Sequence, residues 1–313
     1  MIKSILQRAL GSYEYLKLSY LLKRNEVLRD KHLGERAFLF ATGTSMLEVD
    51  LPRFNGEVTI GCNEIFRHSS FPSFDLKYYV VGVPFRRWRQ LGPRFTHEDH
   101  HQYFLNVDKA FCGRDTEHFY HATMHKYLEQ RGLLSGISRY YFLRKSSLLE
   151  VDEQVIDLTR PGTFYDGGLT MMIALAMFMG CKEIYLFGCG YTYSPVQAFH
   201  FYNCMRCPSG GTEAEMEARL ASFRLSHPES GGWDSKDTNV IELNDKELLV
   251  DYSYYRNTNE GEMDDFYLTH RIIKAFSESC GARIFNVTPS GYDSPVYEKI
   301  DLDTVLRVNE LIK

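Results

Sequence analysis

A glycine flanked by hydroxyl-bearing residues follows the first apolar run of the chain, in the order Thr42, Gly43, Thr44 and Ser45. A glycine directly after a buried strand lets the backbone approach a ligand closely, and neighbouring hydroxyls can donate hydrogen bonds to a phosphate or a ribose. The segment is neither a P-loop nor the Gly-x-Gly-x-x-Gly fingerprint of dinucleotide-binding proteins. It predicts a ligand-binding turn, although turn geometry alone also explains a glycine at such a position.

Two further segments favour an anionic or nucleotide ligand. Asn63 follows the second candidate strand, where a side-chain amide can fix a base or a ribose, although asparagine also forms Asx-turns there. Gly167 and Gly168 precede a long apolar helix, whose start offers free N–H groups at the positive end of the helix dipole. Asp166 beside them is also a suitable N-cap.

Candidate catalytic residues follow the most apolar strand. Tyr191 and Tyr193 carry phenol groups that can hydrogen-bond a departing phosphate, and His200 can take a proton from a sugar hydroxyl. His270, in a later helix, is an alternative base. Each histidine also has a structural explanation, so both stay open.

Other clusters of metal-ligating residue types carry less weight. Cys204 and Cys207 form one CxxC pair, which could hold zinc with His200, but no second pair follows, so no metal site is expected. His118, His121 and His125 have the spacing of one helix face, for which a solvated face is the favoured interpretation.

The elements that must position these residues alternate between short apolar strands and helices. Candidate strands are residues 37–41, 57–61, 76–81, 154–158, 183–188 and 282–287, and candidate helices are residues 168–179, 264–279 and 303–312. The polar, glycine-containing residues at about 189–262 predict a lid insertion. The pattern predicts an α/β fold with an open, mostly parallel, Rossmann-like sheet, whose ligands bind beyond the carboxyl ends of the strands.

Composition limits the function classes further. The 313 residues suffice for one large α/β domain with an insertion, and a net charge of −5 without a basic stripe argues against a nucleic-acid partner. Seven scattered cysteines favour reduced thiols and a cytoplasmic location. No apolar run is long enough for a membrane span.

The N-terminal segment differs from the rest of the chain. Residues 1–33 predict an amphipathic helix ahead of the main domain at 34–313, and residues 1–31 hold seven Lys/Arg against three Asp/Glu. Such a helix can lie peripherally on an anionic inner membrane. The alternatives are packing on the domain itself or on a second subunit of a homo-oligomer.

Taken in order, the motifs resemble a known family. Gly43-Thr-Ser-Met-Leu-Glu-Val-Asp50, the Cys62-Asn63 pair, and the run from Leu175 through Gly180-Cys-Lys-Glu-Ile-Tyr-Leu-Phe-Gly188 are similar to bacterial α-2,3/α-2,8 sialyltransferases. The chain resembles still more closely a broad family related to 6-hydroxymethylpterin diphosphokinases, whose members often accompany surface-polysaccharide genes. This resemblance runs from about Gly34 to the end.

The resemblance implies a metal-independent glycosyltransferase of the GT-A-variant fold, which moves a nonulosonic-acid-type sugar from a CMP-sugar to a glycan hydroxyl without a further cofactor. It implies that Thr42, Gly43, Ser45 and Asn63 hold CMP. Tyr191 and Tyr193 would then steady the leaving phosphate, with His200 or His270 as the base.

Two alternatives stay open. An ATP-dependent diphosphokinase would need carboxylates on a metal and cations on the phosphates, for which Asp166 and Arg160 are the nearby candidates. An inactive nucleotide-sugar-binding protein is the other, because Thr42 stands where the family has Asn and Gly190 where it has Asp.

Overall fold

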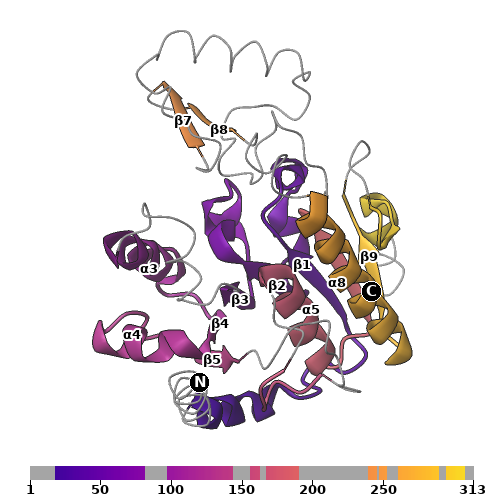
Figure 1. Ribbon diagram of the computed structural model, residues 1–313, viewed down its shortest axis with the longest axis horizontal. Helices are drawn as coiled ribbons and strands as arrows, with labels where there is room; N and C mark the ends of the chain where they lie inside the picture. The colour runs from indigo at the N-terminus through magenta and orange to yellow at the C-terminus, as the bar shows by residue number, and fades with distance from the viewer. Residues whose placement is uncertain are drawn as a thin grey trace, which may run out of the picture.

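The computed structural model describes residues 18–81, 97–143, 156–162, 167–189, 239–244, 247–251, 260–288 and 294–306 (Figure 1). Its centre is an eight-stranded sheet in which every neighbouring pair is parallel. In spatial order the strands are β10 (Glu298–Lys299), β9 (Arg283–Asn286), β6 (Glu183–Phe187), β1 (Arg36–Phe40), β2 (Val58–Cys62), β3 (Tyr78–Val81), β4 (Glu117–His121) and β5 (Arg139–Phe142). The fold is therefore α/β and Rossmann-like, as the sequence predicts.

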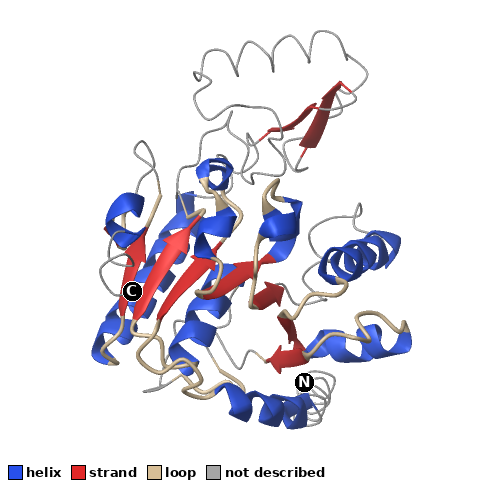
Figure 2. Ribbon diagram, turned by 180° about the vertical axis from the view of Figure 1, so that it is seen from behind, coloured by secondary structure: helices blue, strands red, loops and turns tan. Residues whose placement is uncertain are grey.

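Helices cover both faces of this sheet (Figures 1 and 2). One face packs against α5 (Gly168–Phe178) and α8 (Glu260–Ser279). The other face carries α3 (His97–Phe111), α4 (His125–Gln130) and five short 3-10 helices, which are η2 (Thr44–Glu48), η3 (Leu51–Phe54), η4 (Asn63–Arg67), η5 (Phe71–Ser73) and η6 (Ala122–Met124). A parallel sheet covered on both sides needs strands that are apolar throughout.

The central strands meet this requirement with aromatic rings on one face. Phe38 of β1 stacks on Tyr185 of β6 at a centroid distance of 5.3 Å, and Tyr185 stacks on Phe285 of β9 at 5.4 Å. Ala37 and Leu39 of β1 point to the opposite face, toward α5. The alternation along β1 thus divides the core into two layers, one rich in rings and one rich in aliphatic side chains.

Several sequence predictions are confirmed within a few residues, namely β1, β2, β3, β6, β9, α5 and α8. The prediction of a strand at residues 154–158 is wrong for residues 156–158, which belong to no strand. Residues 154 and 155 lie outside the described residues. The helical interpretation of His118 and His121 is also wrong. Both lie on β4 and are buried in the core layer, and not on a solvated face.

The described part of the N-terminal segment packs on the domain. η1 (Tyr20–Leu28) buries Leu21, Leu22, Asn25 and Leu28. The side-chain amide of Asn25 donates to the carbonyls of Tyr141, 2.7 Å away, and Leu158, 2.6 Å away, which ties η1 to β5. Residues 1–17 lie outside the described residues, and the membrane contact stays a prediction.

Two other predictions are described only in part. Within residues 189–262, the structure describes Cys189, the antiparallel hairpin of β7 (Asn239–Asn244) and β8 (Glu247–Asp251), and the start of α8. The lid therefore stays a prediction. Residues 302–306 are helical, and the rest of the last predicted helix lies outside the described residues. No described helix is long and apolar enough to cross a membrane.

Candidate active site at the carboxyl edge of the sheet

The strand order changes direction at β1. After β1 the chain passes to β2 on one side, whereas β6 returns on the other side of β1. Met46 and Leu51, which follow β1, pack in the ring-rich layer, while Ile273 of α8, which follows β6, packs in the aliphatic layer. The connections after β1 and β6 therefore run to opposite faces. In open α/β sheets, ligands bind at this switch point, outside the carboxyl ends of the strands.

Gly43 and Gly188 bring the backbones that follow β1 and β6 into direct contact. The N–H of Gly43 donates to the carbonyl oxygen of Gly188 over 3.0 Å. A Cβ at Gly43 would lie only 2.4 Å from that oxygen. Gly188 has a φ of +70°, and a Cβ there would lie 2.8 Å from the oxygen of Ala41. The space at this junction therefore admits only two residues without side chains.

Asn63 and Gly168 form a second contact at the same edge. Phe40 pairs with Gly61, so Thr42 and Asn63 each come two residues after this pair. Asn63 has a φ of +50°, which is uncommon for a residue with a side chain. Its Nδ2 lies 3.3 Å from where a Cβ of Gly168 would be. The amide of Asn63 thus lies against the first residue of α5, and Gly167 caps that helix.

Thr42 and Ser45 are both buried, with 5% and 1% of their surface exposed. The Oγ of Ser45 has no hydrogen-bond partner among the described residues. A buried hydroxyl without a partner is costly and calls for an explanation such as a bound molecule. Thr44 begins η2 beside them. The structure thus brings Thr42, Gly43, Thr44, Ser45, Asn63, Gly167 and Gly168 to one edge of the sheet, and we call these seven residues the switch-point cluster.

A network of buried polar side chains contacts the segment that follows β6. Asn286, the last residue of β9, donates from Nδ2 to the carbonyl of Cys189 over 3.0 Å and to the hydroxyl of Ser294 over 3.2 Å. Ser294 in turn donates to the carbonyl of Tyr297. The hydroxyl of Tyr297 lies 2.7 Å from Nδ1 of His270. This chain of contacts fixes Cys189, the residue that leads into Gly190 and the two candidate tyrosines.

His270 is fully buried within α8. Burial lowers its pKa to about 3, because the apolar surroundings disfavour the charged imidazolium. A histidine with such a pKa is a weak proton acceptor near neutral pH. Burial likewise raises the pKa of the Cys62 thiol to about 12, so this sulfur stays protonated beside Gly168.

Three predicted catalytic residues, Tyr191, Tyr193 and His200, lie outside the described residues, and so do Cys204 and Cys207. Within the described ranges, no group of three or more His, Cys, Asp and Glu is placed to hold a metal ion. Gly188 and Asn286 are not among the predicted site residues. The glycine after an apolar strand and the Asn at the end of the last long strand are the signals that point to them.

Comparison with known protein-family models and with curated protein sequences gives no match. Among solved structures, the chain is similar to the MAf glycosyltransferase from Magnetospirillum magneticum AMB-1, with a TM-score of 0.43 and 13% sequence identity. The match covers 96% of this chain and 40% of that chain, so this chain spans less than half the length of the protein it matches. This likeness concerns the fold alone.

The contact between Gly43 and Gly188 yields a stability prediction. Gly43→Ala forces the two backbones apart, and we expect a loss of about 1–3 kcal/mol, as for other overpacked sites. Thermal unfolding followed by circular dichroism measures this loss as a fall of several degrees in Tm. Gly136→Ala is the matched control, because a Cβ there meets nothing within 4 Å and the backbone is not left-handed. Equal Tm values for the two variants would contradict the prediction.

Proposed function

We propose that this protein is a metal-independent glycosyltransferase that transfers a nonulosonic-acid-type sugar from a CMP-sugar to a glycan hydroxyl. The observation that carries the proposal is the gathering of the switch-point cluster where β1, β2 and α5 meet. The segments that carry the resemblance to sialyltransferases are far apart in the sequence, and they meet at the sheet edge where parallel α/β folds bind their ligands.

The cluster offers the groups that a cytidine nucleotide requires. The amide of Asn63 has both donors and an acceptor, and it makes no hydrogen bond within the described part of the chain, so it suits the mixed polar edge of a ribose or a base. Ser45 supplies a buried hydroxyl beside it in the proposed site. Gly168 begins a helix of 11 residues, whose free N–H groups favour the negative charge of the phosphate.

In the proposed reaction, His200 takes the proton of the acceptor hydroxyl while its oxygen forms a bond to the anomeric carbon of the donor sugar. The bond between this carbon and the phosphate oxygen breaks, and CMP departs with the electron pair. Tyr191 and Tyr193 donate hydrogen bonds to the departing phosphate. The low pKa of His270 favours His200 as the base.

The diphosphokinase alternative loses one of its two candidate residues. Arg160 lies 3.4 Å from the carboxylate of Asp157, which is also paired with Arg29. Arg29 packs over the ring of Phe178, at the end of α5 opposite Gly168. A cation at this amino edge of the sheet is far from the proposed phosphate site.

Nucleotide binding gives the first test. Because a ligand that binds only the folded state stabilises it, saturating CMP at about 100 times its Kd adds about 2.7 kcal/mol and raises Tm. We expect this rise with CMP and CDP in the presence of EDTA, and a smaller rise with UDP or ATP. Differential scanning fluorimetry measures it. A rise that appears only with ATP and Mg²⁺ would replace the proposal with the diphosphokinase.

The role of Asn63 has its own test. Asn63→Gly keeps the left-handed backbone, which glycine adopts freely, and removes only the amide. We expect an unchanged or slightly higher Tm of the free protein and a loss of most of the CMP-dependent rise. Asp30→Gly is the matched control, since Asp30 also has a positive φ, of +55°, but lies at the amino edge. If CMP stabilises both variants equally, Asn63 is a turn residue and not a ligand contact.

The base can be identified from the pH dependence of CMP-sugar hydrolysis. A base must be unprotonated, so with His200 as base and an ordinary pKa of about 6.5, kcat/KM falls as the pH drops below that value. With His270 as base, kcat/KM stays level until the pH approaches its pKa of about 3. We expect the first profile, together with loss of activity in His200→Ala. Activity that persists in His200→Ala but vanishes in His270→Ala would reverse the assignment.

A further inference from the structure

The outer side of η1 and the turn after it expose apolar side chains. Tyr20 is 58% exposed, Val27 69% and Leu33 68%. Among the described residues, the other exposed large hydrophobic side chains are exposed by only 40–42% and lie on three separate elements. Exposed apolar side chains that gather in one place mark interaction surfaces, whereas single ones are normal.

Cations stand between these apolar residues. Lys23 and Arg24 are exposed on the same outer side. Glu26, also exposed, pairs with Arg29 at 2.8 Å, and Arg29 is shared with Asp157 at 3.1 Å, so Lys23 and Arg24 are the cations on this side that are left for a partner. We call Tyr20, Lys23, Arg24, Val27 and Leu33 the η1 surface.

The N-terminal residues of the chain are positively charged, whereas the rest of the chain is negatively charged. The chain holds 36 Lys/Arg and 41 Asp/Glu. Seven of the Lys/Arg and three of the Asp/Glu lie in residues 1–31. The first 31 residues therefore carry +4 and the remainder −9. Such a division directs the N-terminal end toward an anionic surface and the rest of the molecule away from it.

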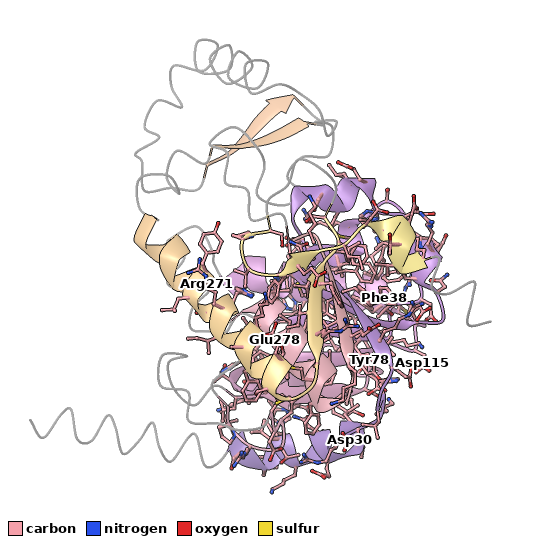
Figure 3. The ribbon with its side chains drawn as sticks, turned by 90° about the vertical axis from the view of Figure 1, so that its right-hand side faces the viewer. Asp30, Phe38, Tyr78, Asp115, Arg271 and Glu278 are labelled. Carbon is pink, nitrogen blue, oxygen red and sulfur yellow. The ribbon has the colours of Figure 1, made fainter. Side chains whose placement is uncertain are left out.

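The η1 surface lies at the amino edge of the sheet. His32 contacts the hydroxyl of Tyr78, the first residue of β3, at 2.8 Å, and Lys31 pairs with Glu117, the first residue of β4. Figure 3 shows Asp30 at the lower end of the molecule, below Phe38. The switch-point cluster is at the opposite edge, so a partner on the η1 surface leaves the proposed active site uncovered.

We infer that the η1 surface docks on an anionic lipid bilayer. Leu21, Leu22, Asn25 and Leu28 fix the inner side of η1 to the domain. On the outer side, Val27 and Leu33 enter the boundary between headgroups and acyl chains, and Tyr20 lies at headgroup level with its hydroxyl in water. Lys23 and Arg24 face the lipid phosphates.

The test uses the full chain in co-sedimentation with vesicles. We expect the protein to sediment with vesicles of phosphatidylglycerol and phosphatidylcholine in equal parts, and to sediment less as the salt concentration is raised. With vesicles of pure phosphatidylcholine, we expect the protein to stay in the supernatant. Lys23→Gln combined with Arg24→Gln lowers the partition coefficient by roughly thirty-fold, at about fivefold per cation. Val27→Ser lowers it by roughly tenfold.

Lys109→Gln combined with Arg271→Gln is the control, because both side chains are exposed and lie on α3 and α8. This pair removes the same charge and leaves binding unchanged. Absence of binding to anionic vesicles, or equal loss with the control pair, overturns the inference. Concentration-dependent dimerisation that Val27→Ser abolishes, without vesicle binding, assigns the surface to a second copy of the chain instead.

Discussion

The contact between Gly43 and Gly188 is the constraint on which the candidate site depends. It joins the ends of β1 and β6 by backbone alone, at the point where the connections separate to opposite faces of the sheet. Thr42 precedes Gly43 and Ser45 follows it closely, while Cys189 comes directly after Gly188. A side chain at either glycine would displace both segments together.

Much of the fold could be predicted because a buried parallel strand has a simple signature. β1, β6 and β9 are apolar runs of four or five residues, and α5 is apolar on every side because it is buried. β4 lacked this signature, since it reads Glu-His-Phe-Tyr-His and its histidines have helical spacing. Tertiary packing, in which the His118 ring lies 4.5 Å from that of Phe111 on α3 and 5.0 Å from that of Tyr79 on β3, makes this histidine suitable for a core.

The position of the switch-point cluster at one sheet edge was predictable from the sequence, whereas its geometry was not. Glycines and an asparagine after apolar runs indicated a ligand, and parallel pairing placed them at one edge because Thr42 and Asn63 follow the same paired residues. The position of the Asn63 amide against Gly168 depends on a helix more than a hundred residues away. The burial of His270 had no local signal, because it results from the packing of α8 against Tyr297.

The pairing of β1 with β6 also affects how the chain folds during its synthesis. Residues 36–40 leave the ribosome early, but one edge of β1 finds its partner only when residues 183–187 have been synthesised. At about 5–20 residues per second, that interval is on the order of 10 s. During it, an apolar strand can pair with β2 and still present a free edge, which is a template for aggregation. A nascent chain of this protein is therefore prone to aggregation until β6 has been synthesised. Any fragment truncated before residue 183 keeps the free edge of β1 and remains prone to aggregation.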